Sequence, residues 1–177
     1  MKSELRKKAK EKLNSLAEDK VVDWSAEIAE KLFLTPEFIY AERVFVYKSF
    51  GKEVKTNLIV DECLRRGKKV CVPKIDGEKM YSIALETISG YYVDEYGISE
   101  PVDGAEVEPD LVIMPLLAFD AEKNRLGRGK GYYDKYCASD FCATVALAFD
   151  AQKVESVPVD EWDYVPDMII SEKEVIE

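Results

Sequence analysis

The chain has 177 residues, 47% of them hydrophobic and 34% charged, a balance typical of a globular fold rather than a disordered or fibrous chain. Its formal net charge of −10 argues against general binding to nucleic acid or to anionic membranes. It contains no histidine, which excludes imidazole metal ligands and Ser-His or Cys-His dyads, and with them most hydrolase chemistry.

No hydrophobic run approaches the roughly 20 residues that span a bilayer, and the charged N-terminus lacks the apolar segment of a secretion signal. The four cysteines, Cys63, Cys71, Cys137 and Cys142, contain no CxxC pair, so we expect reduced thiols and a cytoplasmic protein. The length suits one domain over residues 1–177, and we expect a monomer.

Two helices are predicted at the start of the chain. Apolar residues recur at three- and four-residue spacing across residues 2–18, which predicts an amphipathic helix. A second helix is predicted for residues 25–34, ahead of Thr35, which can cap a short following turn.

Strand and helix patterns alternate along the rest of the chain. Strands are predicted for residues 43–47, 69–72, 80–85, 110–119, 144–149 and 168–170. Helices are predicted for residues 56–66, ended by Gly67, and for a short segment from Gly131. This alternation predicts an α/β fold with a three-layer, largely parallel, doubly wound sheet and helices on both faces. Ligands of such sheets bind at the carboxyl ends of the strands.

Basic residues gather in two places in this acidic chain. Residues 2–12 hold six Lys or Arg, and a second cluster consists of Arg125, Arg128 and Lys130. From composition alone, the first cluster is best explained as a solvated helix face. Two basic clusters in an acidic protein also suit a small anionic ligand.

The most informative segment is the glycine-rich segment, residues 124–134, with the sequence NRLGRGKGYYD. Three glycines at alternate positions let the backbone approach a ligand, while Arg128 and Lys130 supply positive charge, which predicts a phosphate site. It is not a Walker A loop, because the first glycine and the Ser/Thr of that motif are missing. Asp134 can supply a ligand for Mg²⁺ instead. The alternative interpretation is a flexible charged turn.

The nine residues LGRGKGYYD at 126–134, preceded by Ala118-Phe119-Asp120, closely resemble the signature of the 5-formyltetrahydrofolate cyclo-ligases. The resemblance extends over nearly the whole chain. Four further segments are similar to family motifs: KSELR at residues 2–6, Glu53 within GKEVKT, GISEP at residues 97–101, and VPVDEWD at residues 157–163.

The resemblance implies an enzyme that uses ATP and Mg²⁺ to cyclise 5-formyltetrahydrofolate to 5,10-methenyltetrahydrofolate, with release of ADP and phosphate. Phosphorylation of the formyl oxygen would create a leaving group, and no protein nucleophile would be needed. Two alternatives stay open from the sequence. One is a family enzyme acting on another formylated or pterin-like substrate, and the other is a non-catalytic sensor of nucleotides or phosphorylated metabolites.

The resemblance also implies which residues contact each ligand. For ATP they are Lys2, Arg6, Arg125, Leu126, Gly127, Arg128, Gly129, Lys130, Gly131, Tyr132 and Tyr133. For the folate they are Lys48, Glu53, Arg128, Gly129, Lys130, Gly131 and Tyr132. Catalytic roles are implied for Arg128, Lys130 and Tyr132, and Mg²⁺ ligation for Asp134 and Asp163.

Two positions depart from the usual family pattern. Trp162 stands where many relatives carry His, directly before Asp163, and Leu116 stands where many carry Gly. From Trp162 we expect a different local geometry around Asp163, and from Leu116 slightly different packing beside the glycine-rich segment.

Overall fold

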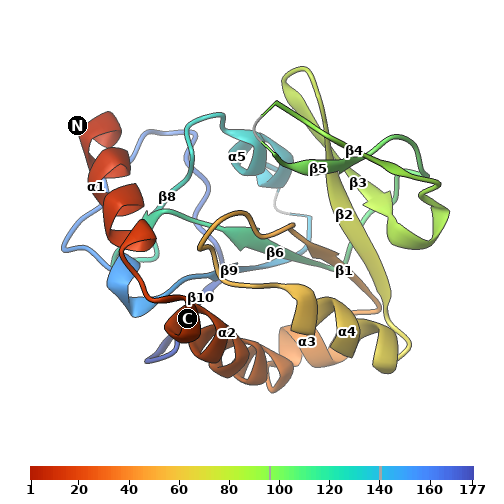
Figure 1. Cartoon of the computed structure of the whole chain (residues 1–177), viewed down its shortest axis with the longest axis horizontal. Coiled ribbons are helices and arrows are strands. Elements are labelled where there is room, and N and C mark those ends of the chain that lie inside the picture. Colours follow the sequence, from red (N-terminus) through yellow and green to blue (C-terminus); the bar gives the residue numbers. More distant parts are fainter. Residues whose placement is uncertain (96, 140) are drawn as a thin grey trace.

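A seven-stranded sheet forms the centre of the computed structural model, which describes residues 1–95, 97–139 and 141–177 (Figure 1). The strand order is β11-β10-β9-β6-β1-β2-β3. These strands are β1 (Arg43–Val46), β2 (Lys69–Asp76), β3 (Lys79–Ala84), β6 (Leu111–Pro115), β9 (Ala143–Leu147), β10 (Met168–Ile170) and β11 (Val175–Ile176). Strands β10, β9, β6, β1 and β2 run parallel, and β3 and β11 pair antiparallel at the edges, which confirms the largely parallel sheet.

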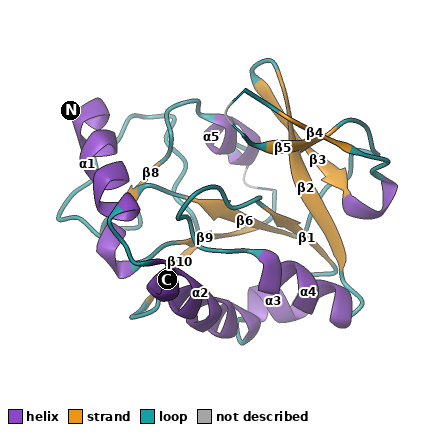
Figure 2. Cartoon of the chain, viewed as in Figure 1, coloured by secondary structure: helices purple, strands orange, loops and turns teal. Residues whose placement is uncertain are grey.

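Helices lie on both faces of the sheet (Figure 2). One face carries α2 (Glu18–Phe33), α3 (Pro36–Tyr40) and α4 (Asn57–Arg65), and the other carries the short α5 (Tyr132–Cys137). Successive side chains of β1 point to opposite faces of the sheet. Val44 and Val46 join the core beneath α2 to α4. Phe45, on the other face, contacts the rings of Tyr133 and Tyr136 in α5. The three-layer prediction is therefore confirmed.

Smaller elements surround this sheet. They are α1 (Lys2–Asn14), the pair β4 (Tyr91–Val93) and β5 (Ser99–Pro101), the pair β7 (Ala118–Phe119) and β8 (Arg125–Leu126), and the 3-10 turns η1 (Leu85–Thr87) and η2 (Asp150–Gln152). Helix α1 packs against β7 and η2 at one end of the molecule. No helix within the described residues is long and apolar enough to cross a membrane.

Several boundaries at the start of the chain differ from the prediction. The first helix ends at Asn14 rather than at residue 18, because the Ser15 hydroxyl donates to the Lys12 carbonyl and the chain turns. The second helix begins at Glu18 rather than at residue 25, with acidic residues in its first turn that favour a helix start. Thr35 caps α3 as predicted, since its Oγ1 accepts from the Phe38 N–H at 3.3 Å.

Two predicted strands have different lengths for identifiable reasons. Pro73 does not end β2, which continues to Asp76 beside β3. Pro73 stands opposite Ser82 of β3. The Ser82 carbonyl accepts a hydrogen bond from the Val107 N–H on the other side of β3, so it does not need a donor from β2. Proline, which has no N–H, is therefore tolerated at this position. The apolar run 110–119 is divided into β6 and β7, because the Leu117 N–H already bonds to Leu126 in the following hairpin.

The strand predicted for residues 144–149 ends at Leu147. The chain turns there into η2, since the Phe149 N–H donates to the Gln152 side chain at 2.8 Å. The remaining predicted elements are confirmed within a residue or two of their bounds, and Gly67 follows α4 with a φ of 71°.

A buried carboxylate shapes the connection from β7 to β8. Asp120 is fully buried, and its Oδ1 accepts from the N–H groups of Glu122 at 3.1 Å and Asn124 at 2.9 Å. Its Oδ2 accepts from Asn124 Nδ2 at 3.0 Å and from the Val157 N–H at 2.8 Å. A buried carboxylate is tolerated when its oxygens are hydrogen-bonded, and here it ties the hairpin to the C-terminal part of the chain.

Asp120→Asn should lower the free energy of unfolding by roughly 2–4 kcal/mol, because the new NH₂ group would face buried N–H donors and leave them unpaired. Urea denaturation followed by circular dichroism measures this change. The exposed Asp61 offers a matched control, and Asp61→Asn should change stability by less than about 0.5 kcal/mol. Equal effects of the two substitutions would contradict the role given to Asp120.

Candidate active site

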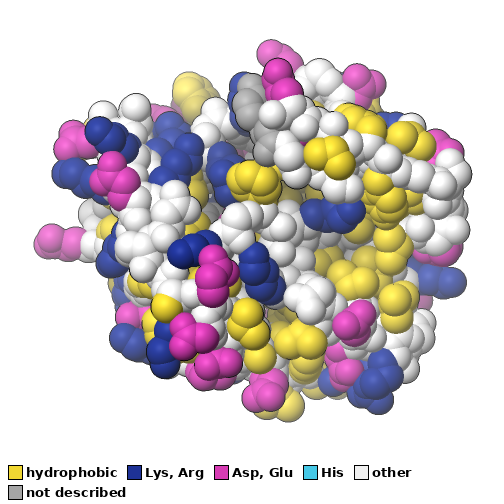
Figure 3. Space-filling view, in the orientation of Figure 1, with side chains coloured by type: hydrophobic (Ala, Val, Ile, Leu, Met, Phe, Trp, Pro, Cys, Tyr) yellow, Lys and Arg dark blue, Asp and Glu magenta, His cyan; other side chains and the backbone are white. Residues whose placement is uncertain are grey.

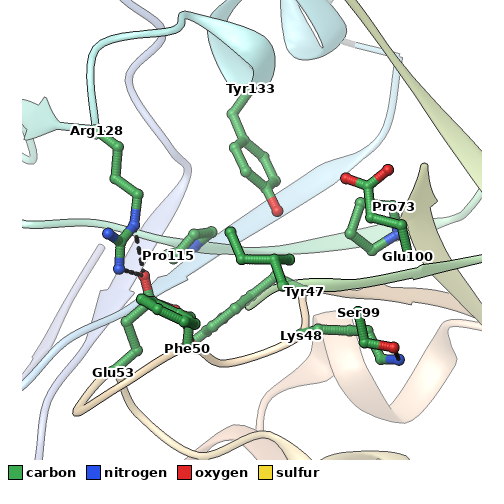
Figure 4. Close-up of a pocket in the computed structure, with 11 residues that line it drawn as sticks. Tyr47, Lys48, Phe50, Glu53, Pro73, Ser99, Glu100, Pro115, Arg128 and Tyr133 are labelled. Atoms are coloured by element: carbon green, nitrogen blue, oxygen red, sulfur yellow. Dashed lines mark hydrogen bonds and ion pairs between the residues drawn. The ribbon is translucent and has the colours of Figure 1, made fainter. Parts of the chain in front are cut away.

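A small cavity lies where the order of the strands reverses. The chain passes from β1 to β2 on one side and later returns to β6 on the other side of β1. Open α/β sheets bind ligands at such a switch point, outside the carboxyl ends of the strands. A cavity of about 110 Å³ occupies this place, with Tyr47 directly after β1 and Pro115 at the end of β6 in its wall (Figure 4).

The cavity combines apolar walls with a few polar groups, as small-molecule sites do. Its apolar lining consists of Tyr47, Phe50, Pro73, Ile98, Pro115 and Tyr133. Its polar lining consists of Lys48, Glu53, Ser99, Glu100 and Arg128. The predicted folate contacts Lys48, Glu53 and Arg128 are therefore brought together by β1 and the glycine-rich segment.

Glu53 and Arg128 form an ion pair at one side of the cavity (Figure 4). Glu53 is 5% exposed, and its Oε1 accepts from Arg128 Nε at 3.0 Å and from Nη2 at 2.6 Å. Its Oε2 accepts from the Phe50 N–H at 2.8 Å. Burial, together with the Glu53 charge, raises the pKa of Tyr133 well above its usual range. The raised pKa favours the neutral form of the Tyr133 hydroxyl.

Lys48 lies at the mouth of the cavity on the β4–β5 side. Its Nζ is 3.9 Å from the centre of the Tyr91 ring and 3.4 Å from Ser99 Oγ. Burial lowers the pKa of this ammonium group. The cation–π contact holds a positive charge beside the cavity, and no carboxylate of the described residues pairs with it, which leaves it available to an anionic ligand.

Residues 127–131, called here the phosphate loop after the contact that the sequence predicts, connect β8 to α5. Gly129 and Gly131 have positive φ angles of 105° and 68°, which favour glycine. Arg6 of α1 lies against this loop, since its Nε donates to the Gly127 carbonyl at 3.0 Å and a Cβ on Gly129 would lie 3.3 Å from its guanidinium carbon. Lys130 is exposed at the tip of the loop.

The two carboxylates expected to bind Mg²⁺ are both engaged by cations. Asp134 Oδ1 accepts from Arg125 Nη2 at 2.7 Å and from the Tyr164 N–H at 3.0 Å. Asp163 Oδ2 accepts from Lys2 Nζ and from a backbone N–H at 2.7 Å. Burial acts to raise the pKa of Asp163, but these hydrogen bonds and the charges of Lys2 and Arg125 outweigh it and lower the pKa.

The donor set at these carboxylates fits a magnesium ion shared with phosphate. Asp134 Oδ2 and Asp163 Oδ1 accept no hydrogen bond from any residue that the structure describes. Within residues 1–95, 97–139 and 141–177, no group of three or more acidic or cysteine residues could hold a metal alone. Two carboxylates completed by phosphate oxygens and water are what Mg²⁺ prefers.

Some predicted contacts lie away from the cavity or are buried. The Tyr132 hydroxyl donates to the Gly77 carbonyl in the β2–β3 turn at 3.3 Å, outside the cavity lining. Leu126 is 1% exposed in the core, and the Arg125 side chain is 2% exposed beneath the phosphate loop. In contrast, Lys2 and Arg6 lie at the end of the molecule where basic side chains gather around α1 (Figure 3).

Sequence reasoning missed part of the cavity and described part of it incompletely. Tyr47 and Phe50 carry no motif signal, and only the strand order places them here. Glu100 belongs to the GISEP segment, whose similarity to a family motif implies no role for this side chain. Of the two unusual positions, Leu116 is 3% exposed in the core beside α5, whereas Trp162 is 70% exposed.

Asp134→Asn should lower the free energy of unfolding by about 2–4 kcal/mol, because it leaves the buried Arg125 guanidinium without its carboxylate. This value already takes into account the partial exposure of Asp134, which reduces the effect. Asp163→Asn should destabilise the protein less, because its partner Lys2 is more exposed and also contacts Asp160 at 2.7 Å. Urea denaturation of both variants without ligand tests this order. A larger loss in Asp163→Asn would contradict the importance of the buried pair.

The sequence and the fold match known proteins over nearly their whole lengths. A 5-formyltetrahydrofolate cyclo-ligase of Mus musculus is 28% identical, with 95% of this chain and 92% of the relative covered. One of Escherichia coli is 27% identical, with 95% and 98% covered. The structure of Aquifex aeolicus 5,10-methenyltetrahydrofolate synthetase superimposes with a TM-score of 0.86 at 34% identity, covering 98% of this chain and 91% of that chain.

A structure of the Mycoplasma pneumoniae 5,10-methenyltetrahydrofolate synthetase shares the fold, with a TM-score of 0.79 at 24% identity and 97% and 98% of the two chains covered. Residues 1–172 match the family model for 5-formyltetrahydrofolate cyclo-ligases. The chain belongs to the 5-formyltetrahydrofolate cyclo-ligase family.

Proposed function

We propose that this protein catalyses the ATP-dependent cyclisation of 5-formyltetrahydrofolate to 5,10-methenyltetrahydrofolate at the cavity between β1 and β6. The Glu53–Arg128 pair carries this proposal, because it joins the phosphate loop to the cavity through a contact of 2.6 Å. The side chains assigned to the pterin and to phosphate are thus neighbours. Direct phosphoryl transfer between two substrates requires this closeness.

The reaction needs positioned charge rather than a protein nucleophile. The formyl oxygen attacks the γ-phosphorus of ATP and ADP leaves, which converts a poor leaving group into a phosphate ester. N10 of the folate then adds to the formyl carbon and loses its proton, and phosphate departs. A site without histidine can support both steps, since orientation and stabilisation of phosphate charge supply the catalysis.

The basic side chains around the phosphate loop suit the triphosphate. Lys130 is exposed at the tip of the loop, and the Arg128 side chain is 42% exposed even while paired with Glu53. Lys2 and Arg6 approach from α1. We assign phosphate contacts to these four side chains and to the loop backbone, whereas Arg125 supports the loop from below.

The carboxylates of Asp134 and Asp163 would hold Mg²⁺, which when bound would neutralise phosphate oxygens during transfer. Arg125 orients Asp134 from the buried side, and Lys2 keeps Asp163 ionised. On the folate side, Glu53 and Lys48 bind the substrate and Tyr133 forms part of the wall. Tyr132 anchors α5 to the β2–β3 turn.

We also propose a monomeric cytoplasmic enzyme, with one catalytic domain over residues 1–177, that acts on small molecules and binds neither nucleic acid nor membranes. The net charge of −10 supports this proposal. So do the free thiols of Cys63 and Cys71, which suit a reducing compartment.

Mixing the protein with 5-formyltetrahydrofolate, Mg²⁺ and ATP should produce the absorbance of the methenyl product, with one ADP and one phosphate released per product. Product absorbance and coupled assays for ADP and phosphate measure this ratio. Release of AMP and pyrophosphate would contradict phosphorylation of the formyl oxygen. Binding of ATP without turnover would instead identify a sensor.

Lys130→Ala should lower kcat by about 10²- to 10³-fold at any Mg²⁺ concentration, because it removes a cation from the transferring phosphoryl group. Asp163→Asn should raise the Mg²⁺ concentration required for half-maximal rate and be partly rescued by excess Mg²⁺. Lys135→Ala, at an exposed position of α5, is the matched control and should leave the kinetics unchanged. An identical Mg²⁺ response in the Lys130 and Asp163 variants would remove Asp163 from the metal site.

A further inference from the structure

The cavity contains a second buried carboxylate that no part of the proposed function uses. Glu100 of β5 is 9% exposed, and it lines the cavity on the side away from Glu53 (Figure 4). Its Oε2 accepts from the Tyr92 hydroxyl at 3.0 Å and from the Ile75 N–H at 3.2 Å. These two donors come from β4 and β2, so the carboxylate is held in a defined position.

Glu100 differs from Glu53 because no basic side chain of the described residues neutralises its charge. Arg128 neutralises Glu53, whereas no Lys or Arg of the described residues lies within ion-pair distance of Glu100. Glu100 Oε1 also accepts no hydrogen bond from any described residue. Glu100 Oε1 is not among the buried unpaired atoms of the described residues, and the residue lines the cavity, so a donor from outside the chain can reach this oxygen there.

A purely structural role does not account for this residue. The bonds to Tyr92 and Ile75 attach β5 to its neighbours through a single oxygen. The amide oxygen of a glutamine would accept the same two hydrogen bonds without the penalty of a buried charge. The second oxygen and the negative charge are therefore the features that a ligand would use.

We propose that Glu100 is a specificity-determining residue that accepts the N8–H of the reduced pterin, on a different ring edge from the one that Glu53 binds. This inference rests on the proposed function, which places the folate in this cavity. A tetrahydropterin carries N–H donors at N3 and its 2-amino group on one edge and at N8 on another. In a fully oxidised folate N8 has no proton, and its lone pair would face the carboxylate. Glu100 thus selects the reduced ring.

Isothermal titration calorimetry with 5-formyltetrahydrofolate and with folic acid tests the inference. Glu100→Gln should weaken binding of 5-formyltetrahydrofolate by about 10- to 100-fold, the value of a charged hydrogen bond, and should reduce the preference for the reduced ligand to within a few fold. The KM for ATP and the melting temperature should stay close to those of the wild type. Glu106→Gln, at an exposed position outside the cavity, is the matched control and should change none of these quantities.

A second variant covers the case in which the glutamine variant does not fold. Glu100→Asp keeps the charge but withdraws it from the ligand, so affinity should fall while the preference for the reduced ligand persists. Equal loss of affinity for reduced and oxidised ligand in Glu100→Gln would overturn the inference, as would no loss at all.

Glu53→Gln separates this inference from the proposed function. If Glu53→Gln weakens folate binding and Glu100→Gln does not, the inference fails while the proposed folate site stands. If neither substitution changes folate affinity, the cavity is not the folate site and the proposed placement of the substrates fails with it.

Discussion

The carboxylate of Asp120 holds together the two chain segments that carry the proposed nucleotide and Mg²⁺ contacts. It accepts N–H groups from the β7–β8 turn on one side and from Val157 on the other. The first segment continues into Arg125 and the phosphate loop, and the second continues to Asp163. Because buried donors and a buried charge would otherwise stay unpaired, folding of this region brings the basic loop and the acidic C-terminal segment together.

On the proposed folate side, the bound substrate would have to replace a contact that the ligand-free protein makes. A cavity of about 110 Å³ is well below the several hundred Å³ of a typical small-molecule site, and two of its lining residues, Arg128 and Glu53, are paired with each other. Both oxygens of Glu53 are engaged, by Arg128 and by the Phe50 N–H. Under the proposed function Arg128 leaves Glu53 when the pterin binds, and its guanidinium is then available to the phosphate.

The sheet was largely predictable from the sequence, and the site only in part. Strands buried on both faces must be apolar at every position, so β6 and β10 were recognisable. Alternating glycines with Arg128 and Lys130 marked the loop from which Arg128 reaches the cavity, and the phosphate contact of this loop stays a prediction. Glu100 was not predictable as a cavity residue, because only the pairing of β4 with β5 and their packing on β2 bring it there. The burial of Arg125 could not be predicted from the sequence either, because a basic residue in a glycine-rich segment is usually solvated.

Three ion pairs explain how the ligand-free site stays electrostatically satisfied. These pairs are Arg128–Glu53, Arg125–Asp134 and Lys2–Asp163. In each pair the basic residue is assigned to bind phosphate or to support the phosphate loop, and the acidic residue is assigned to bind the pterin or Mg²⁺. When phosphate oxygens enter this site, they can bind the basic residues of these pairs. The carboxylates can then bind Mg²⁺ or N–H groups of the ligands instead. Each charge then exchanges one partner for another and is never left bare, which keeps the reorganisation energy of the site small.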